Sequence, residues 1–529
     1  MIENTREIKR LDRKRLIKAV ACSVCFSIML LLGYMIEHQE IRGRAAGFAV
    51  VALGHTVVGG IFVILLYGFF GSRIIVLESR LAFWKIYIIS FGVLLILYFV
   101  SYLALYPGIY AFDAVPQTYA YLSHTITDNH PVLHTVILGA FMDGGAWQGS
   151  VNAGVSDYIT FQYILNAACF SYMLSYIYTF TGRKWIYIVS VLYMGGFTPI
   201  VLQVMTTTKD GMFLPFFVLC MTLTIELNQM ESKEAPVGKW ILWSVSGVFM
   251  TIFRKNCILA LPVLLICMYK NMPSQRKKVI VFSSLTVMFF MLYQMLFVPV
   301  FVSKKVDERE LLSVFAQQMG RFYLDGETEI TEEEKDMVEH LITREGLDSY
   351  QFRIADHAKG WMDMDYYHAH KKELWQTYFS LMMRNPGIAM MSFMELNSGL
   401  WYPGCELTLY PDGRKAYWIV QCFEPAEMQS RIPTLLAYYK LFESSEFATR
   451  NSFTAVLFAP ATYFYLFLFF YMYSVNAEKK NFRPFFRFVL VYWGWYLFGP
   501  VALVRYVSFL FAIVPLYVLV IAQRKGDRA

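Results

Sequence analysis

Charged side chains interrupt the apolar pattern of this 529-residue chain at only a few places, and these residues could do chemistry. Asp113 follows an apolar run closely, and its carboxylate could accept a proton from a hydroxyl group. Basic side chains stand at the ends of other apolar runs, where a planar guanidinium or a compact ammonium could hold phosphate oxygens. These basic residues are Lys209, Arg254, Lys255 and Arg505.

An acid beside convergent cations suits the transfer of a group away from a lipid phosphate. The acid would activate the acceptor, and the cations would stabilise the charge that grows on the leaving phosphate. Five neighbouring residues could position a donor or an acceptor: Gln117, His130, Asp210, Asn256 and Tyr506. Simpler roles stay open, because basic side chains at span ends often reach for head groups and Asp113 could cap a helix that starts near Ala114.

The composition requires a membrane around these residues. Hydrophobic residues make up 57% of the chain and charged residues only 16%, well below the usual share in soluble proteins. The formal net charge of +7 is no sign of nucleic-acid binding, because the basic residues form short clusters between apolar runs. We therefore expect an all-α polytopic membrane protein.

Apolar runs of about 20 residues are long enough to cross a bilayer. We expect about 12 transmembrane helices, within a range of about 10 to 14, because several runs are short or meet at tight polar corners. Gln162 and Asn166 are polar residues inside one run, and both are typical of hydrogen bonds between helices. The expected spans are 16–36, 46–71, 82–106, 156–180, 185–204, 207–225, 239–253, 256–270, 279–303, 452–474, 485–500 and 502–523.

Lys and Arg in the short loops predict the orientation, because cytoplasmic loops are enriched in both. The basic N-terminus and the C-terminal tail are then cytoplasmic, and the protein lies in the cell membrane. Asp113, the four basic residues and the five positioning residues all fall on the opposite, outer side. The loops expected inside are 72–80, 181–184, 228–239, 269–278, 476–483 and 523–529.

Three parts follow along the chain. Residues 1–303 form a transmembrane module whose first large outer loop is 107–155, residues 304–451 form a mainly helical extracytoplasmic domain, and residues 452–529 return to the membrane. Thr331 and Glu334 predict a capping box at the start of a helix in that domain. Cys405 and Cys422 could form a disulfide there, although two unrelated thiols are an equally good interpretation.

Short motifs carry a resemblance to the GT-C superfamily of glycosyltransferases, which includes protein mannosyltransferases that use polyprenyl-phosphate-linked sugars. An acid in the first large outer loop is the shared feature. The chain is most similar to a GT-C-like group of uncharacterised bacterial membrane proteins. The motifs are Tyr106-Pro107-Gly108, Asp113, Gln117, His130-Pro131, Thr208-Lys209-Asp210, Arg254-Lys255-Asn256 and Gln317-Gln318.

The resemblance implies a catalytic base at Asp113, with Lys209, Arg254 and Arg505 near the lipid phosphate. Many relatives carry two adjacent acids in this loop and some bind a divalent metal. Here Asp128 is 15 residues beyond Asp113, which speaks against a divalent metal but leaves one open, and no cofactor is required.

We therefore expect a glycosyltransferase that moves a sugar from a polyprenyl-phosphate donor to a glycan, lipid or protein acceptor outside the cytoplasm. Two other classes stay open. One is a transporter or flippase for lipid-linked saccharides, although acids are nearly absent from the middles of the runs. The other is a noncatalytic membrane protein of the cell envelope.

Overall fold

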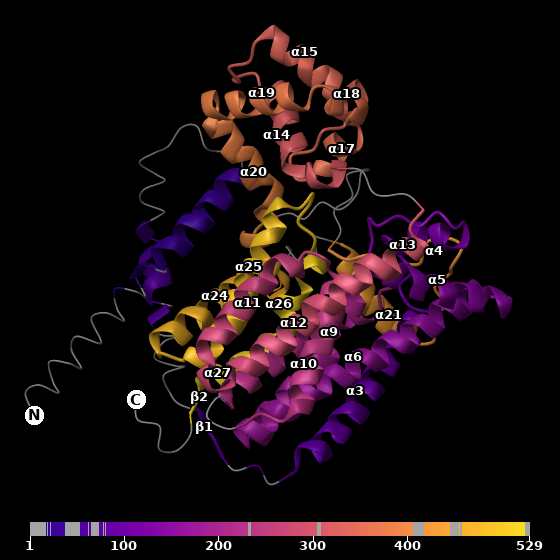
Figure 1. The fold of residues 1–529 in the computed structure, drawn as a ribbon, viewed down its shortest axis with the longest axis vertical. Helices are drawn as coiled ribbons and strands as arrows, with labels where there is room; N and C mark the ends of the chain where they lie inside the picture. The colour runs from indigo at the N-terminus through magenta and orange to yellow at the C-terminus, as the bar shows by residue number, and fades with distance from the viewer. Residues whose placement is uncertain are drawn as a thin grey trace, which may run out of the picture.

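The computed structural model describes most of the chain from residue 81 onward, and shorter pieces before it. Within this part the fold is helical apart from two strands of two residues each. Figure 1 shows a bundle of long helices with a group of short helices at one end. The described residues are 17, 20–21, 23–37, 53–54, 56–61, 63–64, 74–77, 79, 81–230, 234–303, 308–405, 417–444, 454 and 457–523.

Four helical segments in the described part are long and apolar enough to cross a membrane. A fifth results if α7 (Lys184–Gly196) and α8 (Thr198–Val204), which are bent by 54°, count as one span. The chain thus has the helices of a membrane protein, but they do not support the expected number of about twelve. The four are α3 (Phe83–Leu105), α9 (Lys209–Gln229), the run Pro273–Phe301 with α12 (Arg276–Leu292) and α13 (Val298–Phe301), and the run Val504–Ile521 with α26 (Ser508–Ala512) and α27 (Tyr517–Ile521).

Most other expected spans form helices that are too short or too polar to count. The corner at Arg254 and Lys255 divides one apolar stretch into helices of 17 and 15 residues, whereas a straight span needs about 20. Expected spans 16–36, 46–71 and 452–474 lie partly outside the described residues. The helices concerned are α6 (Val151–Thr181), α10 (Val237–Phe253), α11 (Cys257–Asn271), α24 (Pro460–Asn476) and α25 (Arg483–Trp495).

Loops that were expected on one side of the membrane meet at one end of the bundle. Strand β1 (Ile74–Ile75) pairs in parallel with β2 (Ala522–Gln523), at the end opposite the short helices (Figure 1). Next to this pair, the backbone N–H of Leu77 donates to the carbonyl of Thr181 at 3.0 Å. Three of the loops predicted as cytoplasmic are therefore neighbours.

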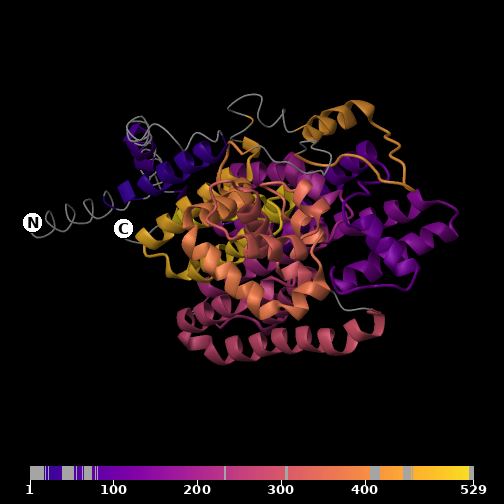
Figure 2. The ribbon, with the colours of Figure 1, turned by 90° about the horizontal axis from the view of Figure 1, so that it is seen from above.

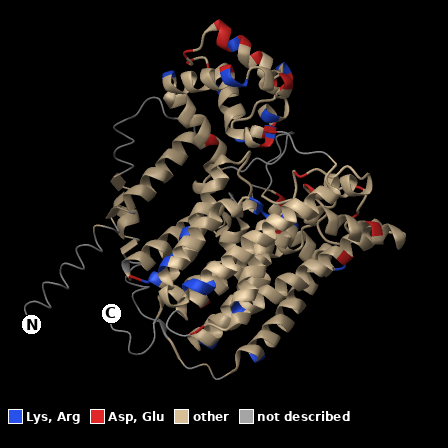
Figure 3. Ribbon diagram, viewed as in Figure 1, with Lys and Arg blue, Asp and Glu red and all other residues tan. Residues whose placement is uncertain are grey.

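The group of short helices has an apolar core of its own, built from residues 312–389, and we call it the cap domain. The predicted capping box is confirmed, since Thr331 and Glu334 bind each other's backbone. Figure 3 shows acidic and basic residues crowded on this domain and sparse along the long helices, and Figure 2 shows it lying over the C-terminal helices. The helices are α14 (Ser313–Leu324), α15 (Glu332–Leu341), α16 (Arg344–Asp348), α17 (Ala355–Gly360), α18 (Met364–Ala369), α19 (Lys371–Arg384) and α20 (Pro386–Trp401).

Residues 417–444 depart from the expected domain 304–451, because they pack on the first part of the chain instead of the cap domain. The backbone N–H of Phe423 donates to the carbonyl of Tyr110, and that of Gln429 to the carbonyl of Tyr106, both at 2.7 Å. Helix α21 (Pro433–Lys440) follows. This segment therefore covers the loop that leads to Asp113.

Candidate functional site

The loop after α3 is tied to the corner before α9. Ile109 pairs with this corner through its backbone, accepting from the N–H of Thr207 at 3.0 Å and donating to the carbonyl of Met205 at 2.8 Å. Gly108 permits the turn, because its φ of +127° disfavours any side chain and a Cβ there would collide with a side chain of α6. The pairing brings Asp113 next to the first residue of α9, Lys209.

Asp113 lies among three side chains from distant parts of the chain. Its Oδ2 is 3.1 Å from NH1 of Arg505, 3.5 Å from Nζ of Lys209 and 3.9 Å from Nδ1 of His130. Its Oδ1 accepts from NH2 of Arg505 at 3.3 Å. Helix α4 (Ala114–Leu122) begins where expected, but the Asp113 side chain makes no capping bond to it. The carboxylate therefore forms the ion pair and does not cap the helix.

A second carboxylate, Asp210, lies beside the first pair. It forms an ion pair with Arg254, and its Oδ2 is 3.6 Å from NH1 of Arg505. Arg505 thus bridges two acids. The guanidinium carbons of Arg254 and Arg505 both lie 4.9 Å from the centre of the Tyr506 ring, as cation–π contacts do. We call Asp113, His130, Lys209, Asp210, Arg254 and Arg505 the charge cluster.

The charge cluster carries an excess of positive charge. Its three cations outnumber its two carboxylates by one, and within the described part of the chain Nε of Arg254 and Nε of Arg505 have no hydrogen-bond acceptor although both are buried. Buried donors without an acceptor are costly, so an anion placed here would relieve both the charge and the missing hydrogen bonds.

Asp113 and His130 each keep one charge state near pH 7. Burial opposes ionisation of Asp113, but Arg505, Lys209 and His130 hold the pKa of its carboxyl well below the ordinary value. Burial, assisted by the charge of Lys209, lowers the pKa of His130 to about 3. His130 is therefore neutral near pH 7, and its Nδ1 can accept from the Lys209 ammonium at 3.1 Å.

Lys255 and Asn256, both predicted site residues, point away from the charge cluster. Lys255, expected on the phosphate, donates instead to the carbonyl of Asp128 at 2.5 Å, in the loop that carries His130. Asn256 is exposed at the start of α11. Neighbouring residues at a helix end point in different directions, so Arg254 enters the cluster and the next two residues do not.

A family model described as "Family of unknown function (DUF6020)" matches residues 98–401 of the chain. The chain belongs to the DUF6020 family. No curated protein and no solved structure matches it. In this DUF6020 chain the matched part holds five members of the charge cluster, while Arg505 and Tyr506 lie beyond it. The C-terminal helices therefore complete a site whose other residues lie in the matched region.

Behind the cluster, the DUF6020 chain has a buried row of hydrogen bonds that sequence reasoning largely missed. Gln117 of α4 lies 2.7 Å from Nδ1 of His134, whose Nε2 lies 2.8 Å from the hydroxyl of Tyr158. That hydroxyl donates to Gln162 at 3.0 Å. Nε2 of Gln162 donates to the carbonyls of Val204 and Thr206 at 2.8 and 2.9 Å, which confirms the expected hydrogen bonding between helices.

The direction of this row follows from counting protons. A neutral imidazole has one N–H, and Tyr158 has one proton, which it gives to Gln162. His134 must then donate through Nε2 and accept at Nδ1, so the amide of Gln117 presents its NH₂ group to the ring. That orientation also gives the buried amide nitrogen of Gln117, which otherwise has no acceptor, a partner in Nδ1 of His134. The row links α4 to the corner before α9.

His134 and Tyr158 look like ordinary core residues in the sequence, since each stands in a mainly apolar helix. The available signal was the spacing of Tyr158 and Gln162, four residues apart on α6 and therefore on one helix face. His134, in α5 (Val132–Trp147), comes one turn after the His130-Pro131 pair. Only the packing of α5 against α6 brings these residues into one row.

The possible disulfide of this DUF6020 chain is not formed. The sulfur of Cys405 lies 3.3 Å from the hydroxyl of Ser398, and the thiol of Cys422 donates to the carbonyl of Gly108 at 3.1 Å. The two residues follow different paths, because Cys405 ends the cap domain and Cys422 packs on the first loop. Among the described residues, no three His, Cys, Asp or Glu side chains gather in a way that could hold a metal ion.

Proposed function

We propose that the charge cluster binds the phosphate of a polyprenyl-phosphate-linked sugar, and that the protein transfers this sugar to an acceptor hydroxyl. The observation that carries the proposal is the excess of cations over carboxylates, with buried guanidinium donors that lack acceptors. A phosphate supplies negative charge and several acceptor oxygens, which is what Lys209, Arg254 and Arg505 need.

The position of the cluster favours a lipid phosphate over a free one. Lys209 is the first residue of α9, and Arg505 is the second residue of the run Val504–Ile521. Both segments are candidate membrane spans, so both cations lie where a span begins. Phosphates of membrane lipids lie at this level, next to the hydrocarbon layer.

Asp113 is the general base in this proposal. It takes the proton of the acceptor hydroxyl while the acceptor oxygen bonds to the anomeric carbon. The bond from that carbon to the phosphate oxygen breaks, and its electron pair stays on the polyprenyl phosphate. A single displacement of this kind inverts the anomeric configuration.

Donor binding would also strengthen the base. Without donor, Arg505 pairs with Asp113 and keeps the pKa of its carboxyl low. When a phosphate takes part of the Arg505 guanidinium, that stabilisation weakens and the carboxylate becomes a better proton acceptor. The site thus couples the arrival of the donor to activation of the acceptor.

The topology belongs to the proposal as well. A GT-C-like arrangement would place the charge cluster and the cap domain outside the cytoplasm, with both termini inside. A maleimide that cannot cross the membrane should label Asp143→Cys, at an exposed position of α5, and should not label Lys277→Cys, which is also exposed. Labelling of Lys277→Cys from outside would contradict this orientation.

The activity test is mass spectrometry of cell-envelope glycans from a deletion strain that carries plasmid copies of the protein. Wild type should restore a sugar modification that the deletion strain lacks, and Asp113→Asn should not. Asp143→Asn, an exposed carboxylate of the same outer segment, is the matched control and should restore it. Restoration by Asp113→Asn at normal expression would show that Asp113 is not the base.

A further inference from the structure

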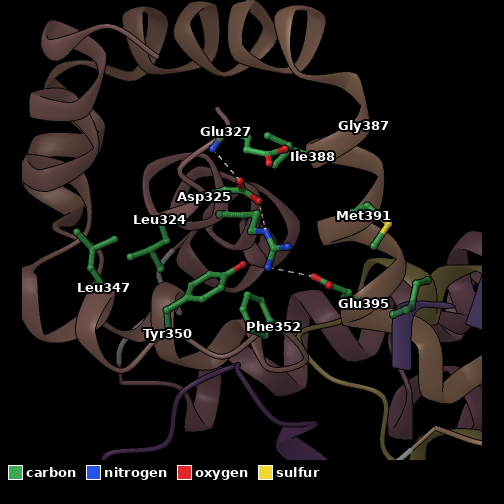
Figure 4. Close-up of a pocket in the computed structure, with 12 residues that line it drawn as sticks. Leu324, Asp325, Glu327, Leu347, Tyr350, Phe352, Gly387, Ile388, Met391 and Glu395 are labelled. Atoms are coloured by element: carbon green, nitrogen blue, oxygen red, sulfur yellow. Dashed lines mark hydrogen bonds and ion pairs between the residues drawn. The ribbon is translucent and has the colours of Figure 1, made fainter. Parts of the chain in front are cut away.

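The cap domain contains a cavity of about 760 Å³ between α14, α16 and α20, which the proposed function has not used (Figure 4). This volume is typical of small-molecule sites. Ile36, from the helix near the N-terminus, closes part of it, so the cavity lies where the cap domain meets the rest of the protein. Its walls combine three acids, one arginine, two aromatic rings and several aliphatic side chains.

Arg321 contacts two carboxylates and an aromatic ring inside the cavity. Its Nε lies 3.3 Å from Oδ2 of Asp325, and its NH1 lies 3.4 Å from Oε2 of Glu395. Its guanidinium also stacks on the Phe352 ring at 4.4 Å from the centroid. Figure 4 shows the two carboxylates approaching from different sides, with Tyr350 and Phe352 on a third. Such fixed donors and acceptors need little ordering when a ligand binds.

The aromatic wall is also fixed in place. The amide of Gln317 donates to the carbonyls of Gln351 and Phe352 at 2.8 and 3.0 Å, and the hydroxyl of Tyr350 donates to the carbonyl of Gln317 at 3.0 Å. Phe352 is nevertheless 45% exposed. A large aromatic ring that is held by its backbone and left open to a cavity can pack against the flat C–H face of a ring-shaped ligand.

The cavity disfavours anionic ligands, because its three carboxylates outnumber its one guanidinium. Two of these carboxylates, Asp325 and Glu395, already pair with Arg321, which reduces their attraction for a cation. An uncharged ligand with several hydroxyl groups suits both kinds of group, because a hydroxyl can donate to carboxylate oxygens and accept from guanidinium N–H groups. From this geometry we infer that the cavity binds an uncharged sugar ring, as the recognition subsite for the acceptor glycan.

The assignment of the cavity to the acceptor rests on the proposed function. The fold connects the cavity with the charge cluster. Two residues beyond Phe352, Ile354 forms a backbone bridge with Val501, and the N–H of Ala355 donates to the carbonyl of Pro500 at 2.8 Å. Arg505 of the charge cluster comes four residues after Val501 in the chain. The aromatic wall of the cavity is therefore connected through a few residues to the loop that supplies Arg505.

The test is ligand-observed NMR with the purified full-length protein in detergent. The probes are the neutral tetrasaccharides of β-1,4-linked N-acetylglucosamine, α-1,4-linked glucose and α-1,6-linked mannose, with glucose 6-phosphate and spermidine as charged comparisons. At least one neutral tetrasaccharide should bind, and the charged probes should not. Phe352→Ala should weaken binding about tenfold, whereas Phe379→Ala, an exposed phenylalanine of α19, should not change it.

Failure of this inference can be told apart from failure of the proposed function. Asp113→Asn should bind the tetrasaccharide as wild type does, since Asp113 is not in the cavity. If Glu395→Gln and Phe352→Ala both bind like wild type, the cavity is not the sugar site. If no neutral tetrasaccharide binds, or if a charged probe binds better, the inference is wrong even where Asp113 proves essential for transfer.

Discussion

Arg505 pairs with Asp113 across 392 residues of sequence, with NH1 3.1 Å from one carboxylate oxygen and NH2 3.3 Å from the other. This pair joins the candidate span Val504–Ile521 to the loop that follows α3. Since Arg505 is also 3.6 Å from Asp210, one guanidinium holds together two acids that begin different helices. The site can form only when the C-terminal helices have packed against the rest.

The two lysines expected on the phosphate should behave differently. Lys209→Met should weaken binding of a polyprenyl phosphate, measured by titration of the purified protein, by about 10- to 100-fold, because one charge-assisted contact is lost. Lys255→Met should leave that affinity nearly unchanged, since Lys255 donates to the carbonyl of Asp128. Equal losses in the two variants would show that Lys255 also reaches the lipid phosphate.

Removing one partner of the buried pair Arg254–Asp210 should destabilise the fold. Arg254→Met removes the cation that pairs with the buried carboxylate of Asp210, which costs about 3–5 kcal/mol. Adding Asp210→Asn should recover part of the lost stability, because the carboxylate that lost its main partner is then replaced by an uncharged amide. Thermal unfolding in one detergent measures both variants, and a double variant no more stable than Arg254→Met would contradict the account.

The buried row behind the site should matter for function as well as stability. Tyr158→Phe removes the hydroxyl between His134 and Gln162, and leaving buried polar groups without a partner costs about 1–3 kcal/mol. Gln162, which binds the corner before α9, would lose its link to His134, so polyprenyl-phosphate affinity should also fall. Tyr119→Phe, at an exposed position of α4, is the control. Unchanged stability and affinity in Tyr158→Phe would rule out the row as a support.

The protonation of His130 predicts a pH dependence of stability. Its pKa is lowered to about 3, so between this value and the usual one near 6.5 the unfolded chain binds a proton that the folded protein does not. Stability from this source is therefore full above pH 6.5 and is lost as the pH falls toward 3. Asp113, whose pKa is also lowered, adds a loss of the same sign in more acidic solution.

Melting temperatures at pH 7.5 and pH 4.5 check this expectation. Wild type should lose more stability over this interval than His130→Asn, which has no imidazole to keep neutral. His124→Asn, at an exposed histidine six residues before His130, controls for the loss of an imidazole elsewhere. A pH dependence that is the same in wild type and His130→Asn would mean that the imidazole is not held neutral.

Much of the site could be predicted because its residues break an apolar pattern. Asp113, Lys209, Arg254 and Arg505 stand out as charges at the ends of hydrophobic runs, and the structure brings them together. Lys255 gives the same signal but does not belong to the charge cluster, since the sequence does not reveal in which direction a side chain at a corner points. The described residues contain fewer candidate spans than expected for a similar reason, because hydropathy alone cannot separate a full span from two short helices at a polar corner.

The sequence by itself determined that this is a helical membrane protein with a distinct set of charged corners, because composition and periodicity report how each segment meets lipid or water. Tertiary structure alone decided which corners meet. It paired Arg505 with Asp113, turned Lys255 away, separated Cys405 from Cys422 and built the row through His134 and Tyr158. These relations depend on side-chain direction and on contacts between distant segments, which a local pattern does not contain.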